Sequence, residues 1–148
     1  MIKKYEILEH KADLKIRVFG QTKEDLFQNA LLGMSENMKS EIKKPPEVFK
    51  KKINKFDSAA HIAKLKIKSI DLSSLLVDFL SEVLYLSQTN KKTYTQVKFT
   101  KFANTKLTAT ISGKKVERFN EDIKAVTYHE LEVKKVDGIW TATILFDI

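Results

Sequence analysis

The stretch IKAVTYHELEVKKVDGIWTATILFDI, residues 123–148, carries the pattern that decides the fold. Two runs rich in β-branched and aromatic residues are separated by Asp137 and Gly138, a residue pair that favours a two-residue hairpin turn. The pattern therefore predicts a β-hairpin with strands over 123–135 and 139–148. In its second strand, alternate side chains are apolar and are expected to face the core: Trp140, Ala142, Ile144, Phe146 and Ile148.

The same turn predicts the register of the hairpin. If Val136 pairs with Ile139, counting back along two regular strands pairs Tyr128 with Asp147. Both side chains are then expected on the face opposite the core, together with Lys124. At the rise of a regular strand, Lys124 would lie about 13 Å from the level of Asp147, too far for a direct salt bridge.

The three histidines, His10, His61 and His129, do not have the helical spacing that is typical of a metal-binding motif. The predicted register pairs His129 with Phe146, so we expect His129 to be a structural histidine on the core side. The sequence also contains no nucleophile elbow and no glycine-rich phosphate loop. No residue is assigned a catalytic role.

Further from the hairpin, the chain alternates strand and helix patterns. Strands are predicted from Leu14 to Gly20, from Ala63 to Lys68, over 94–102 and over 107–112. Thr22 and Asp71 have the side chains that cap helices, and each precedes apolar residues at helical spacing. We expect an α+β fold over 1–148, a single domain with two helices packed on a largely antiparallel β-sheet.

Composition restricts the function classes. The chain has no cysteine, which excludes disulfides and thiolate metal sites. Its N-terminus and its short apolar runs predict a cytoplasmic protein without a membrane segment. The net charge of +8 suggests RNA binding, but only Arg17 and Arg118 are arginines and the lysines are spread along the chain, which argues against a dedicated RNA surface.

The chain end offers a candidate metal site. Asp147 interrupts an apolar run and is followed by the terminal carboxylate of Ile148. Oxygen ligands of this kind suit Mg²⁺, Ca²⁺ or Mn²⁺. Charged residues near a C-terminus are common, however, and this pattern by itself favours a solvated chain end over a metal site.

Four segments in order along the chain resemble the archease family: YEILEHKAD at 5–13, DLSSLLVDFLSEVLYLSQ at 71–88, KAVTYHEL at 124–131 and FDI at 146–148. The resemblance implies a divalent-metal site formed by Asp13 and Asp147 with oxygens of Ile148. His10 is a candidate for the second shell of this site. Lys124 matches the functional lysine of the family, and its expected distance from Asp147 favours a contact with a partner.

The resemblance also implies a function. Members of the family are non-enzymatic cofactors of an RtcB-type tRNA-splicing RNA ligase and promote its guanylylation and multiple turnover, so tRNA would be involved indirectly and DNA not at all. One position departs from the family pattern. Archeases usually have Thr or Ser where this chain has Lys11, and a cation at this position should weaken metal binding by about 1 kcal/mol.

The sequence leaves two alternative functions open. A chaperone-like or RNA-binding modulator of tRNA processing would bind RNA with a steep salt dependence that is indifferent to metal. A metal-dependent hydrolase built on Asp13 and Asp147 would cleave nucleotides or RNA by itself.

Overall fold

The computed structural model describes residues 3–42 and 61–148 of the 148-residue chain. Within these residues, eight strands and two helices are formed, and every strand pair is antiparallel. In chain order the elements are β1 (Tyr5–His10), β2 (Asp13–Gly20), α1 (Lys23–Asn37), β3 (Ser40–Ile42), β4 (Ile62–Lys68), α3 (Leu72–Asn90), β5 (Lys92–Phe102), β6 (Lys106–Phe119), β7 (Ala125–Val136) and β8 (Ile139–Asp147).

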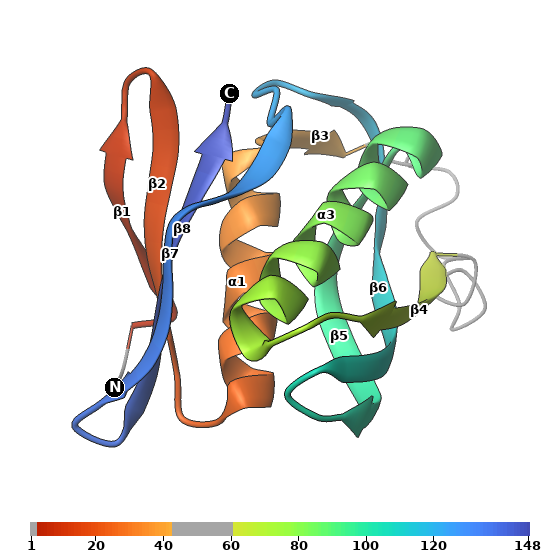
Figure 1. Ribbon diagram of the computed structural model, residues 1–148. Coiled ribbons are helices and arrows are strands. Elements are labelled where there is room, and N and C mark those ends of the chain that lie inside the picture. The colour runs from red at the N-terminus through yellow and green to blue at the C-terminus, as the bar shows by residue number, and fades with distance from the viewer. Residues whose placement is uncertain (1–2, 43–60) are drawn as a thin grey trace.

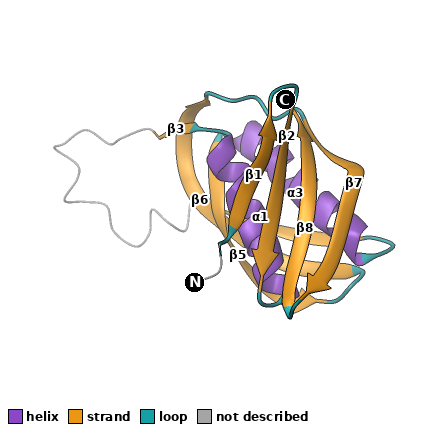
Figure 2. Ribbon diagram, turned by 90° about the vertical axis from the view of Figure 1, so that its left-hand side faces the viewer, coloured by secondary structure: helices purple, strands orange, loops and turns teal. Residues whose placement is uncertain are grey.

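The strands form two sheets with the helices between them (Figure 1). The first sheet has the order β1-β2-β8-β7, and Figure 2 shows it in front of both helices. The second sheet is built around β6, which pairs with β3, β4 and β5. The predicted α+β fold with two helices and antiparallel strands is confirmed. Local sequence patterns did not predict β1 and β3, or the division of the strands into two sheets.

The core lies in the layer of helices and includes side chains from both sheets. Phe27 of α1 and Phe79 of α3 pack with Phe99 and Phe102 of β5, with ring centroids 5.0–6.3 Å apart. Tilted and edge-on rings at these separations are the favourable aromatic geometry. The helices are therefore apolar on more than one side because each contacts two sheets.

Both predicted helix caps are confirmed. The hydroxyl of Thr22 accepts a hydrogen bond from the amide of Asp25 at 3.0 Å, and the carboxylate of Asp71 accepts one from the amide of Ser74 at 2.7 Å. These bonds satisfy amides that have no partner within the helix. In the part of the chain that the structure describes, neither helix has the length and hydropathy to span a bilayer.

The predicted hairpin turn is also confirmed. Val136 pairs with Ile139, and both residues of the turn have positive φ, 51° at Asp137 and 79° at Gly138. This conformation belongs to the type I′ turn, whose twist matches that of the flanking strands. The side chains predicted for the core side of β8 are buried or partly buried, as expected.

The register predicted beyond this turn is wrong, because β7 contains a bulge. Thr127 pairs with Leu145 and Glu132 pairs with Thr143, so five steps along β7 match two steps along β8. The three additional residues of β7 move its beginning toward the end of β8. Ala125, rather than Tyr128, is therefore the partner of Asp147.

Two side-chain hydrogen bonds, one to α3 and one to β2, stabilise the bulge. The hydroxyl of Tyr128 donates a hydrogen bond to Asp78 of α3. Glu130, which has a φ of 55°, accepts a hydrogen bond from Lys15 of β2 at 2.8 Å. A left-handed conformation is costly for a residue with a Cβ atom, and these tertiary contacts offset that cost.

The bulge also overturns the prediction for His129. Val126 takes its place opposite Phe146, and the side chain of His129 is 70% exposed. Its Nε2 atom lies 3.8 Å from Oε1 of the neighbouring Glu130. His129 is thus a surface residue and not a core histidine.

Candidate metal and partner site

The first residue of β2 and the last residue of β8 lie side by side. Asp13 and Asp147 are direct partners in the antiparallel ladder between these strands. Their neighbours Leu14 and Phe146 also pair with each other, and both are buried. Since side chains alternate between the faces of a sheet, Asp13 and Asp147 extend from the outer face, at the end of the sheet where the chain terminates (Figure 2).

This arrangement places two negative charges opposite each other. The Cβ atoms of directly opposed residues are about 5 Å apart, and like charges in this position destabilise a sheet. Among the residues that the structure describes, neither carboxylate has an ion pair or a hydrogen bond. A divalent cation is a partner that would remove the repulsion and use the oxygens of both groups.

The donor set is small. Within residues 3–42 and 61–148, no group of three or more acidic or histidine side chains could enclose a metal ion. A metal here would therefore depend on two carboxylates, with any further oxygens coming from backbone or solvent. The side chain of Ile148 packs partly against the core. This contact holds the residue after Asp147 in place beside the two acids.

Lys124 lies much closer to Asp147 than the sequence predicted. Its amide donates a hydrogen bond of 2.8 Å to the carbonyl oxygen of Asp147, so the expected separation of about 13 Å is wrong. The bulge of β7 is the cause, because it brings residue 125 level with the end of β8. The exposed side chain of Lys124 therefore starts beside the acidic pair.

His10 has a partner other than Asp13. Its Nε2 atom lies 3.8 Å from Oε1 of Glu121, in the loop between β6 and β7. Its partner in the strand ladder is Leu14, which places it on the face of the sheet opposite Asp13. The geometry does not favour the expected second-shell role.

Sequence reasoning missed Lys15, which continues the outer face of β2 next to Asp13. Its ammonium donates to Glu130, and this hydrogen bond and the accompanying charge attraction hold the pKa of Glu130 below its ordinary value. Residue 130 is distant in sequence from residue 15, so no local pattern could have revealed the pair. Lys15 is thereby occupied with a carboxylate outside the acidic pair.

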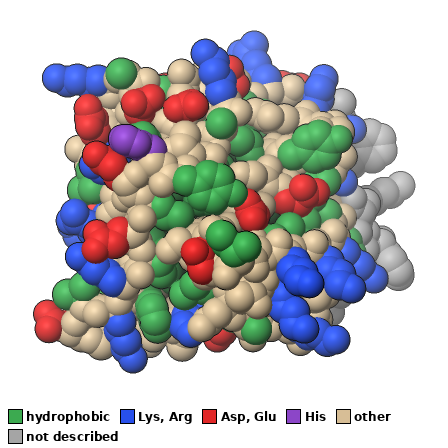
Figure 3. Space-filling model, viewed as in Figure 1, with side chains coloured by type: hydrophobic (Ala, Val, Ile, Leu, Met, Phe, Trp, Pro, Cys, Tyr) green, Lys and Arg blue, Asp and Glu red, His purple; other side chains and the backbone are tan. Residues whose placement is uncertain are grey.

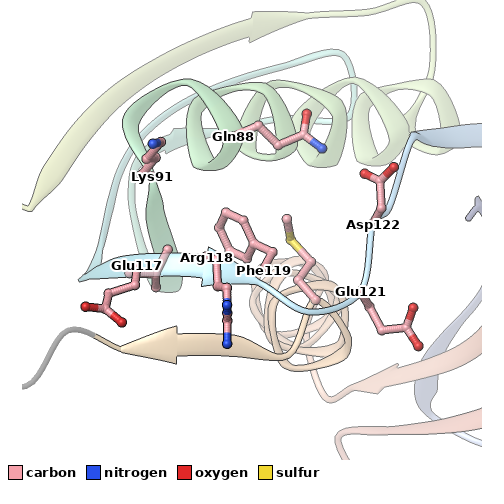
Figure 4. A pocket seen from close by; sticks show the side chains of 9 residues that line it. Gln88, Lys91, Glu117, Arg118, Phe119, Glu121 and Asp122 are labelled. Atoms are coloured by element: carbon pink, nitrogen blue, oxygen red, sulfur yellow. The ribbon is translucent and has the colours of Figure 1, made fainter.

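A pocket of about 390 Å³ lies near the same end of the molecule, between α3, the end of β6 and the following loop (Figure 4). Gln88 and Asp122 extend toward each other across its rim, and Gln88 also donates a hydrogen bond of 2.9 Å to the carbonyl of Ile123. The lining contains both signs of charge and neither member of the acidic pair. The pocket is therefore separate from the candidate metal site.

Comparison with known proteins identifies the family. Residues 5–148 match the model of the Archease protein family (MTH1598/TM1083). The chain belongs to the archease family. It is 36% identical to the protein archease of Methanosarcina barkeri over 99% of this chain and 97% of that protein. It is 29% identical to the protein archease of Thermococcus kodakarensis, over 99% of this chain and 100% of that protein.

Solved structures agree with this family. The solution structure of Methanobacterium thermoautotrophicum protein 1598 superposes with a TM-score of 0.68 at 26% identity, covering 99% of this chain and 100% of that protein. The crystal structure of a Thermotoga maritima protein described as an archease and possible chaperone superposes with a TM-score of 0.63, over 95% of this chain and 94% of that one. At 15% identity, the second comparison shows the archease fold alone.

Proposed function

We propose that this chain is a non-enzymatic, metal-binding cofactor that promotes guanylylation and multiple turnover of an RtcB-type tRNA-splicing RNA ligase. Membership of the archease family supports the ligase as partner. The observation that carries the proposal is the cross-strand pair of Asp13 and Asp147, two acids on one face without a partner among the described residues. The bound ion would be Mg²⁺, Ca²⁺ or Mn²⁺, the hard cations that oxygen ligands prefer.

The chemistry of such a site fits a role in activation. A hard cation held by two carboxylates keeps several coordination positions for water or for oxygens of a partner. It can therefore approach the phosphate-rich site of a ligase while it remains bound to this chain. Lys124, whose side chain starts beside Asp147, would add a positive charge at the same contact. In this role, residues 13, 147 and 148 hold the ion and residue 124 faces the ligase.

The test measures RNA-ligase turnover and guanylylation with the purified ligase, GTP and this chain. Asp13→Asn and Asp147→Asn are each expected to lower divalent-metal affinity by at least about 10-fold, since each removes one of two charged ligands. Both should abolish multiple turnover at limiting metal. Lys124→Gln should bind metal at least as tightly as the unchanged chain but lose activation.

The control is Asp137→Asn, in the turn at the other end of β8. It changes the same charge on the same sheet, and Asn tolerates the positive φ of this position. Metal affinity and ligase turnover should stay at the level of the unchanged chain. If Asp13→Asn and Asp137→Asn have the same effect, the acidic pair is not the metal site. If the unchanged chain has no effect on the ligase, the proposed function is wrong.

A second candidate function is a chaperone-like one. The Thermotoga maritima protein with the same fold is described as a possible chaperone. On this chain, three large apolar side chains are more than half exposed on and beside α3, namely Ile70, Tyr85 and Tyr128. Exposed apolar groups of this kind can bind partly unfolded protein. Suppression of heat-induced aggregation of a test protein, lost in Tyr85→Ser, would support this function.

A further inference from the structure

The outer face of the second sheet is covered with lysines. Lys64, Lys66 and Lys68 are exposed on β4, and Lys98 and Lys101 are exposed on β5. The register places these residues on both sides of threonines of β6, and Lys68 pairs with a further lysine of that strand. We call these residues the lysine face: Lys64, Lys66, Lys68, Lys98, Lys101 and Lys106, with Thr108 and Thr110 between them.

The lysine face has one sign of charge. Neither β4 nor β5 contains an Asp or Glu, and β6 has none before Glu117. No ammonium group of the six lysines has a hydrogen bond or an ion pair with another residue that the structure describes. Figure 3 shows basic side chains gathered at the lower right, where β4, β5 and β6 lie in Figure 1. The lysines are spread along the sequence, but the fold collects them.

The spacing of these charges suits a regular polyanion. Alternate residues of one strand are about 7 Å apart, and strands on the two sides of β6 are about 10 Å apart. Two rows of cations therefore run along the sheet, with hydroxyl groups of Thr108 and Thr110 between them. Lysines and hydroxyl side chains are groups that contact phosphate oxygens in nucleic-acid complexes.

The types of residue argue against base recognition. The lysine face has no arginine, which is the residue that most often reads guanine. Phe99 and Phe102 of β5 pack into the core and are not available to stack on bases. A face that binds phosphate without reading bases should bind different sequences equally well.

We propose that the lysine face binds the phosphate backbone of RNA without sequence preference. The choice of RNA rests on the proposed function, in which the partner ligase acts on RNA. A membrane surface is disfavoured because threonines stand between the lysines, where a membrane-binding face would have Trp, Phe or Leu. The lysine face and the acidic pair lie on different sheets, so RNA can occupy one while a metal occupies the other.

The experiment measures fluorescence anisotropy of a labelled RNA hairpin as this chain is added, from 50 to 300 mM NaCl. The unchanged chain should bind with an affinity that falls steeply with salt, and a hairpin of scrambled sequence should bind equally. The triple variant Lys64→Gln, Lys66→Gln, Lys98→Gln should bind at least about 10-fold more weakly at 100 mM NaCl. Its salt slope should decrease by about 2 to 3, since each lost contact removes about one unit.

The matched control is the triple variant Lys3→Gln, Lys134→Gln, Lys135→Gln, which loses the same charge outside the second sheet. It should bind RNA within about 2-fold of the unchanged chain. Thermal unfolding of both variants checks that each is folded. Equal losses in the two triple variants would mean that net charge alone attracts RNA, and this would overturn the proposal. Stronger binding to phosphatidylserine vesicles than to RNA would overturn it in favour of a membrane.

Asp13→Asn separates this inference from the proposed function. It should keep full RNA binding, in EDTA as well as in Mg²⁺, because the lysine face needs no metal. If this variant and the unchanged chain bind RNA but neither activates a ligase, RNA binding by the lysine face is supported and the proposed function is refuted. If the unchanged chain activates the ligase and does not bind RNA, the lysine face is refuted and the proposed function stands.

Discussion

The two sheets present outer faces of different electrostatic character. On the first sheet, basic and acidic side chains stand close together and neutralise each other: Lys15 with Glu130 at 2.8 Å, Arg17 with Glu6 at 3.4 Å and Lys134 with Glu132 at 3.2 Å. On the second sheet, the six lysines of the lysine face have no acidic neighbour on their strands. On both sheets, strands alternate apolar side chains that face the core with polar side chains that face outward. This alternation alone therefore does not predict the charge of the outer surface.

This difference indicates which kind of ligand each face can bind. On the first sheet many charges are paired, and the two acids that face each other at its end have no partner among the described residues, which favours a small cation. Charges of one sign on the lysine face of the second sheet repel each other and favour a large polyanion. Four tests follow from this comparison, from the largest expected effect to the smallest.

The largest effect is expected at Gly113 in the second sheet, and Gly138 in the first sheet serves as the comparison. A Cβ atom at Gly113 of β6 would lie 1.7 Å from the carbonyl oxygen of Thr93, so Gly113→Ala should cost roughly 3 kcal/mol of unfolding free energy. Gly138, in the turn of the first sheet, has open space but a φ of 79°. Gly138→Ala should cost only about 1 kcal/mol. Urea denaturation measures both, and equal costs would show that β5 and β6 can separate to make room.

Lys11→Thr tests whether the positive charge of Lys11 weakens metal binding by the two acids at the end of the first sheet. Lys11 is exposed between β1 and β2, two residues before Asp13. Its removal should tighten binding of Ca²⁺ or Mg²⁺ by about 1 kcal/mol or less, and the gain should shrink in high salt. Calorimetric titration at two ionic strengths measures it, with Lys11→Arg as the control that should bind like the unchanged chain. Absence of a gain at low salt would mean that Lys11 points away from the acids.

Removing one lysine from each face is expected to change the unfolding free energy in opposite directions. Lys66→Gln removes repulsion between neighbouring lysines and should raise the unfolding free energy by about 0.5 kcal/mol or less at low salt. Lys15→Gln removes the contact with Glu130 and should lower it. Both changes should fade in 0.5 M NaCl, because salt screens exposed charges. Urea denaturation at two salt concentrations measures this, and the same sign for both variants would contradict the comparison.

The smallest effect is a pKa change on the first sheet. The hydrogen bond from Lys15 holds the pKa of Glu130 below its ordinary value of 4.5, so Lys15→Met should raise it toward that value. Since the folded pKa is the lower one, the pair stabilises the fold above pH 4.5 and loses this contribution as pH falls through the folded pKa. NMR titration of the Glu130 carboxyl group measures the shift. In Lys3→Met, which leaves the pair intact, the titration of Glu130 should not change.

Local patterns were sufficient for much of the fold. The helices, their caps at Thr22 and Asp71, and the turn at Asp137 and Gly138 were predicted correctly, because each depends on residues within a few positions of one another. The candidate metal residues came instead from the resemblance to archeases. That Asp13 lies opposite Asp147 depends on the pairing of strands near the two ends of the chain, which periodicity does not encode.

The sequence by itself determined the two helices, six of the eight described strands and the apolar side chains of these elements, because those properties follow from local spacing. Only the tertiary structure decided the bulge in β7 and the lysine face. The bulge depends on contacts of Tyr128 with Asp78 and of Glu130 with Lys15, 50 and 115 residues away in the chain. The lysine face exists because β4 and β5 pair with the same central strand, so that charges spread along the sequence share one surface.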